Sequence, residues 1–131
     1  MDKYQEGLKV FQEMMPHLAS SVNNEEQSEK RFAQELGKLS IENVFGTLWT
    51  RPGLDRRSRS LVTLGILIAL RASSEMSVHF PIAIQNGLTE AELEEVIYHS
   101  SAYAGFPAAS EASHIAQKVF NSKNHSKKEE I

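Results

Sequence analysis

The chain has 131 residues, a formal net charge of −3 and no cysteine. That length suits one ordinary domain, and the 40% of hydrophobic residues is enough for one core. The lack of cysteine excludes disulfides, thiolate metal sites and cysteine nucleophiles, and the small net charge does not favour nucleic acid or an anionic membrane. The N-terminus has no apolar stretch of signal-peptide type, and the longest apolar run, Leu61–Leu70, is shorter than the roughly 20 residues that span a bilayer. We therefore expect a cytoplasmic protein.

Amphipathic helices joined by short turns are predicted along most of the chain. The first runs from Lys3 to Met15, and Pro16 follows its end. A second is predicted from Glu26 to Trp49, and Gly37 and Gly46 mark two positions at which it is open to a break. Each carries apolar residues at helical spacing, so each is expected to pack one face against a core.

The segment Arg51–Asp55 contains a Pro-Gly turn signal, and Asp55 can cap a following helix. That helix, from Arg56 to Arg71, is apolar on nearly every side, and we interpret it as the central buried helix. Its β-branched residues would also suit a strand, but its length and its helical neighbours favour a helix.

A fourth helix is predicted from Ser74 to Gln85, where Asn86-Gly87 is a typical C-terminal signal. Thr89 and Glu92 have the spacing of a capping box that opens a fifth helix. Pro81 stands inside the fourth helix and predicts either a kink or a later helix start.

The break at Gly105-Phe106-Pro107 precedes a final helix from Ala108 to Phe120, and the polar residues 121–131 are expected to form a disordered tail. Small residues on the last two helices suit either contacts between subunits or close packing within one chain. No segment alternates apolar and polar residues with a period of two. The prediction is one all-α domain of about six helices over residues 1–120.

Several runs, in this order, are similar to the carboxymuconolactone decarboxylase family. They are Phe45–Asp55, Arg59–Thr63, His79, Asn86–Thr89, Glu95–His99, Ala102–Ala109 and His114–Ala116. The resemblance covers about residues 35 to 120 and implies the alkylhydroperoxidase D-like helical fold. It also implies a homo-oligomer, either a trimer or a hexamer.

The peroxidase-like branch of this family carries two cysteines before a histidine and a glutamate further upstream. Counting back from His79, the cysteine positions hold Ala72 and Glu75, and the glutamate position holds Ser60. Thiol-dependent peroxidase or peroxiredoxin activity is therefore excluded. Arg59 followed by Ser60 instead resembles the decarboxylase branch.

That branch implies the conversion of 4-carboxymuconolactone to 3-oxoadipate enol-lactone and CO₂ in aromatic (protocatechuate) catabolism, the β-ketoadipate pathway. Because the lactone accepts the electrons that decarboxylation releases, no cofactor is expected. The implied partner is a small carboxylated lactone, with no nucleic acid and no membrane. The alternatives are a family member that acts on another lactone or oxo acid, and a non-catalytic oligomeric protein that binds small molecules.

His79 is the candidate proton donor, because histidine titrates near neutral pH, and Glu75 one turn earlier could orient or charge it. A histidine satisfied in a core or an interface is the alternative. Arg51 and Arg59 are candidates for the substrate carboxylates, since a guanidinium binds a carboxylate in a fork. For either arginine, an ion pair at a helix end or on the surface is the alternative.

His99 and Tyr103 lie four apart on one predicted helix and could donate hydrogen bonds to the lactone, and a structural role is the alternative for His99. Trp49 and Phe106 could form apolar walls of a pocket, although such residues more often belong to a core. A metal held by the histidines and nearby carboxylates, such as the pair Glu111 and His114, is not expected. No His-x-x-x-His pair accompanies them.

Overall fold

The computed structural model describes residues 1–17 and 31–129, with side chains described as far as Ser122. The described helices are α1 (Lys3–Met14), α3 (Glu35–Ser40), the π-helix η1 (Ile41–Leu48), α4 (Arg56–Leu70), α5 (Ser73–Gln85), α6 (Glu90–Ala104) and α7 (Phe106–Glu129). None of the described residues forms a strand, which confirms the all-α prediction. No helix in these described ranges is both long enough and apolar enough to cross a membrane.

The chain divides into two compact units, Met1–Arg56 and Arg57–Ile131, which we call the first and second units. The expectation of one domain over residues 1–120 stays a prediction. The predicted helix start at Glu26 lies outside the described residues. In the described part, residues 32–34 form a turn with Ala33 at a φ of +55°, so the prediction of a helix there is wrong, and the helix begins at Glu35.

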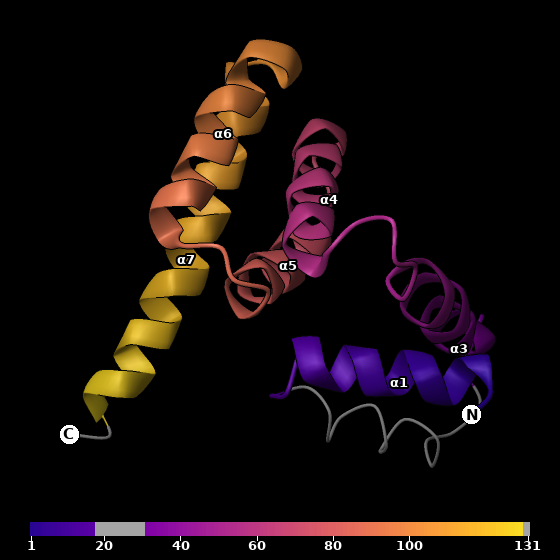
Figure 1. Cartoon of the computed structure of the whole chain (residues 1–131). Helices are drawn as coiled ribbons and strands as arrows, with labels where there is room; N and C mark the ends of the chain where they lie inside the picture. The colour runs from indigo at the N-terminus through magenta and orange to yellow at the C-terminus, as the bar shows by residue number, and fades with distance from the viewer. Residues whose placement is uncertain (18–30, 130–131) are drawn as a thin grey trace. The chain divides into compact units, whose positions relative to one another are not determined.

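In the first unit, α1 packs against η1 at very close range (Figure 1). A Cβ added at Gly7 would collide with the carbonyl of Ile41, and one at Gly46 would collide with the carbonyl of Lys3. Two glycines therefore allow the helices to touch backbone to backbone. Gly46 was expected as a possible helix break, but the helix continues through it and uses it as a contact point.

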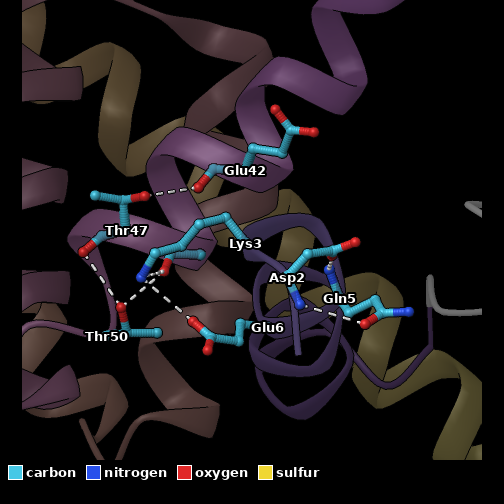
Figure 2. A network of polar contacts seen from close by, with 8 residues as sticks. Asp2, Lys3, Gln5, Glu6, Glu42, Thr47 and Thr50 are labelled. Carbon is cyan, nitrogen blue, oxygen red and sulfur yellow. Dashed lines mark hydrogen bonds and ion pairs between the residues drawn. The ribbon is translucent and has the colours of Figure 1, made fainter.

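Polar groups in and beside α1 and η1 make further hydrogen bonds, as Figure 2 shows. The Lys3 ammonium donates to the carbonyl of Gly46 at 3.5 Å, and the Thr50 hydroxyl donates to the same carbonyl at 2.9 Å. The Thr47 hydroxyl donates to the carbonyl of Glu42, five residues earlier, at 2.9 Å, as the wider turn of a π-helix permits. At the start of α1, Asp2 and Gln5 form a capping box.

The π-helix was not predicted, and it sets which side chains are buried. Ile41, Phe45 and Trp49, spaced four apart, are all buried in the first unit. The ring of Phe45 lies edge-on to Phe11 at 5.2 Å and stacks on Trp49 at 6.3 Å. The α-helix has 3.6 residues per turn, whereas a π-helix has more. Residues spaced four apart therefore stay closer to one face in η1 than they would in an α-helix.

The second unit has one core that α4, α5, α6 and α7 build together. α6 and α7 form a helical pair, and α5 packs against α7 (Figure 1). The core is made of aliphatic, aromatic and alanine side chains from all four helices: Leu64, Ile68, Met76, Phe80, Ala83, Leu93, Ile97, Ala108, Ala112 and Ala116 among them. The small residues of α7 thus pack within the chain, the second of the two possibilities that the sequence left open.

The interpretation of α4 as a helix buried on nearly every side is wrong for this chain. Leu64 and Ile68 are fully buried, whereas Val62, Ile66 and Leu70 are 54%, 54% and 70% exposed. The helix thus buries one stripe at helical spacing and leaves the opposite apolar stripe accessible. Its composition alone did not reveal which side meets the core.

Capping and stop residues in the sequence predicted most of the other helix ends correctly. Thr89 and Glu92 form the predicted capping box, and α5 ends at Asn86-Gly87 with Gly87 at a φ of +100°. α7 differs from the prediction at both ends, because it begins at Phe106 and continues to Glu129. A proline in the first helical turn costs no helical hydrogen bond, so Pro107 does not delay the helix start.

Candidate functional site

α5 carries the two residues expected to perform the proton chemistry. It begins at Ser73 and runs without interruption through Pro81 to Gln85, so the proline does not move the helix start past His79. Nε2 of His79 lies 4.0 Å from Oε2 of Glu75, one turn earlier. The structure therefore brings this predicted pair together.

His79 points into the apolar side of α5. It is 8% exposed, and its helix neighbours Met76, Phe80 and Ala83 are fully buried. Glu75 is mostly exposed, so its carboxylate reaches the imidazole from the solvent side. This face of α5 is the apolar face that the sequence predicted for the histidine.

Burial and charge act on His79 in opposite directions. Removal from water lowers the pKa of His79 below 6.5, and the Glu75 carboxylate raises the pKa in part. The imidazole is therefore mainly neutral at neutral pH, and its charge responds to any new negative charge placed beside it. A group of this kind can switch protonation state when an anionic substrate binds.

The two candidate arginines belong to different units. Arg59 is half-buried on α4, in the same unit as His79, and Arg51 is exposed after η1 in the first unit. Among their neighbours, Arg56 binds Glu13 at 2.7 Å and Arg57 binds Glu92. These two arginines are thus engaged in ion pairs.

The remaining predicted residues lie in two places. His99 and Tyr103 are exposed on α6 with their rings 5.3 Å apart, so the structure brings this second pair together. Phe106 follows at the start of α7 and is 79% exposed. Trp49 is buried against Phe45 in the core of the first unit, as its alternative interpretation held.

One group at the start of α5 was missed from the sequence. Glu111 of α7 accepts hydrogen bonds from Arg71 at 2.7 Å and from the Ser73 hydroxyl at 3.0 Å. Arg71 has a φ of +56°, which residue type does not predict for an arginine. From the sequence, Glu111 is a candidate only for a metal ligand together with His114. Within the described residues, no three histidine, aspartate or glutamate side chains gather as a metal site would require.

A buried polar contact joins α4 to the end of α5. Ser60 is almost fully buried, and its hydroxyl accepts a hydrogen bond from the Asn86 amide at 3.0 Å. Ser60 stands where the peroxidase-like branch would place its glutamate. The contact satisfies a buried hydroxyl and helps to fix the end of the helix that carries His79.

Comparison with known proteins indicates the same family as the sequence motifs. Residues 34–118 match the model of the carboxymuconolactone decarboxylase family. The chain is 38% identical over 118 residues to 4-carboxymuconolactone decarboxylase of Acinetobacter baylyi, covering 90% of this chain and 87% of that protein. It is also 38% identical over 118 residues to nitrosuccinic acid decarboxylase of Metarhizium robertsii, covering 90% of this chain and 81% of that protein.

Proposed function

Because the chain belongs to the carboxymuconolactone decarboxylase family, and two of its relatives are named as decarboxylases, we propose that this carboxy-lyase converts 4-carboxymuconolactone to 3-oxoadipate enol-lactone and CO₂ in the cytoplasm. The 38% identity to a 4-carboxymuconolactone decarboxylase over 90% of the chain supports this substrate. The buried His79 beside Glu75 supports the chemistry.

The substrate supplies its own electron sink. When the carboxylate on the ring leaves as CO₂, its bonding electron pair moves through the ring double bond to the lactone carbonyl. The ring carbon next to that carbonyl then takes one proton, which completes the enol-lactone. The protein has to bind the other carboxylate, stabilise the oxygen that gains charge and deliver that proton.

His79 delivers the proton in this proposal. In the free protein, burial holds the pKa of His79 low, so the imidazole is mainly neutral. A bound dicarboxylate adds negative charge beside it, which raises the pKa and favours the imidazolium. Glu75 acts in the same direction from 4.0 Å away. After CO₂ leaves, the imidazolium protonates the ring carbon and regains a proton from solvent.

The other residues bind the substrate. Arg59, in the same unit as His79, is the cation for the remaining carboxylate. Arg51, in the first unit, is a second candidate cation that substitution tests. His99 and Tyr103 donate hydrogen bonds to the lactone oxygen, and Phe106, which is exposed on α7, forms an apolar surface. No cofactor takes part, because the lactone carries the electrons itself.

A second candidate function has its own support. Nitrosuccinic acid decarboxylase is as similar to this chain as the first relative. A nitro group beside a carboxylate can accept electrons as a lactone carbonyl does, so one site could serve either kind of acid. The alternative is therefore a decarboxylase of another small acid with a built-in electron sink, such as a different lactone or an oxo acid.

We also propose that the protein is a homo-oligomer, a trimer or a hexamer. Its support in the second unit is the exposed stripe of Val62, Ile66 and Leu70 on α4. Light scattering of the purified protein tests this proposal. A monomer at micromolar concentration would contradict it.

The decisive experiment is turnover by the purified protein. We expect loss of the ultraviolet absorbance of 4-carboxymuconolactone with release of one CO₂ per lactone. His79→Gln should lower kcat by roughly 10²–10⁴-fold, the usual contribution of a general acid. His114→Gln, an exposed histidine on α7, is the matched control and should leave kcat unchanged. Turnover of nitrosuccinate but not of the lactone would favour the second candidate, and binding of small dicarboxylates without turnover of either acid would contradict both.

A further inference from the structure

The turn between α4 and α5 has an unusual residue at its key position. The amide of Arg71 donates to the carbonyl of Ile68 at 3.1 Å, and that of Ala72 donates to the carbonyl of Leu67 at 3.0 Å. These two bonds form a Schellman motif, whose left-handed position usually holds glycine. Here Arg71 takes that position with a φ of +56°.

α5 ends with the same motif and the usual residue. Gly87 donates to the carbonyl of Ile84 at 3.0 Å, and Leu88 donates to that of Ala83 at 3.0 Å. Gly87 reaches a φ of +100° without a steric penalty. The comparison shows that Arg71 occupies a backbone position for which glycine is better suited. The contacts of the Arg71 side chain can offset this strain.

The side chain of Arg71 binds a carboxylate from α7. Its Nε and Nη2 both lie 2.7 Å from Oε2 of Glu111 on α7. Oε1 of Glu111 accepts a hydrogen bond from the hydroxyl of Ser73 at 3.0 Å. The Glu111 carboxylate thus binds both Arg71, in the turn before α5, and Ser73, the first residue of α5. The adjacent Ala112 is fully buried in the core, which fixes this part of α7.

α5 has no side-chain cap, and the bond from the Ser73 hydroxyl to Glu111 ties its first residue to α7. The N-cap residue of α5 is Ala72, which has no side chain able to bind the free amides of the first turn. Glu75 lies in this first turn and reaches His79 only at 4.0 Å. A first turn that frays would therefore move Glu75 away from the imidazole.

We propose that Glu111 and Arg71 are positioning residues that hold the first turn of α5, so that Glu75 stays beside His79. Their effect on turnover rests on the proposed role of His79 as proton donor, but their effect on the imidazole does not. Removal of either side chain should lower the pKa of His79 by displacing the first turn of α5. Removal of the Glu75 carboxylate should lower the same pKa directly, by deleting the charge.

Two variants break the contact in different ways. Arg71→Gly removes the guanidinium and at the same time relieves the left-handed strain, so it should fold at least as well as the natural protein. Glu111→Gln keeps the size of the side chain but removes its charge. Glu94→Gln, an exposed carboxylate on α6, is the matched control for the loss of one negative charge.

The imidazole of His79 is followed by NMR titration of full-length protein labelled in histidine, with His79→Gln used to assign the signal. We expect Arg71→Gly, Glu111→Gln and Glu75→Gln each to lower the pKa of His79, and Glu94→Gln to leave it unchanged. When Glu75→Gln is already present, adding Arg71→Gly or Glu111→Gln should lower the pKa no further. This lack of additivity distinguishes positioning from a direct charge effect.

In turnover assays, Arg71→Gly and Glu111→Gln should lower kcat roughly tenfold with KM nearly unchanged, because a small misplacement of a catalytic pair is costly. Folded variants in which the pKa of His79 matches that of the natural protein would overturn the proposal, as would shifts that add to the shift of Glu75→Gln. A protein that turns over neither acid but shows the expected titrations would contradict the proposed function and leave the positioning role supported.

Discussion

Nε2 of His79 and Oε2 of Glu75 lie 4.0 Å apart on successive turns of α5, with the imidazole buried and the carboxylate exposed. The distance is at the outer limit of an ion pair, so the carboxylate raises the pKa of the imidazole without cancelling the effect of burial. The acid strength of the proposed proton donor is therefore set by two opposing causes. Each can be altered by substitution.

The pH dependence of turnover follows from this balance. If the imidazolium of His79 is the active form, kcat/KM should fall as the pH rises above its lowered pKa, because kcat/KM reports the free protein. Glu75→Gln removes the raising charge and should move this fall to lower pH. Initial rates across the acid to neutral range provide the measurement. A kcat/KM that rises with pH in this range would contradict the role of His79 as an acid.

The pH dependence of stability tests the burial of His79 without substrate. Between the lowered folded pKa and 6.5, the unfolded chain binds more protons than the folded chain, so the free energy of unfolding rises with pH. Stability is therefore lost as the pH falls below 6.5, by at most about 1.4 kcal/mol per pH unit.

Urea denaturation of the natural protein and His79→Gln at several pH values provides this test. The variant should lose less stability on acidification. Glu111, whose pKa is lowered mainly by its hydrogen bond from Arg71, contributes equally to both proteins. The difference between them therefore isolates His79. Equal acid dependence would show that the imidazole is hydrated in the folded protein.

The close contact between α1 and η1 predicts opposite effects for two similar substitutions. Gly7→Ala places a methyl group against the carbonyl of Ile41 and should cost roughly 1–3 kcal/mol of stability. Gly37→Ala, in α3, meets nothing within 4 Å and should instead stabilise by about 0.5–1 kcal/mol. Thermal or urea unfolding measures both. Equal effects of the two alanines would mean that α1 does not approach η1 this closely.

Substitution of the candidate arginines tests substrate binding. Arg59→Ala and Arg51→Ala should each raise KM about tenfold or more, since a hydrogen bond to a charged group contributes about 1.5–3 kcal/mol. Arg56→Ala is the control, because that guanidinium binds Glu13 at 2.7 Å. Steady-state kinetics with the lactone gives the three values. An unchanged KM in both test variants would contradict the proposal that these arginines bind the substrate carboxylate.

Much of the helical pattern could be predicted because it depends on neighbours in sequence. The capping box of Thr89 and Glu92, and the stop of α5 at Asn86-Gly87, involve residues within one turn of each other. The pairing of Glu75 with His79 likewise follows from the four-residue spacing of a helix. Local sequence carries such features because a single helical turn decides them.

Other features depend on contacts between distant segments. The burial of one stripe of α4 is decided by what packs against it, and its composition was too uniformly apolar to show which side that is. The path of η1 through Gly46 depends on the approach of α1, and the conformation of Arg71 depends on a carboxylate from α7. Such arrangements have no signature in the residue types alone.

The sequence by itself determined the helical class, the family and the exclusion of thiol chemistry. These follow from periodicity, from motif order and from the absence of cysteine. Only the tertiary structure decided how deeply His79 is buried and that Glu111 and Arg71 hold the start of its helix. The physical reason is that pKa values and helix positions depend on desolvation and on charge contacts between helices that are distant in sequence.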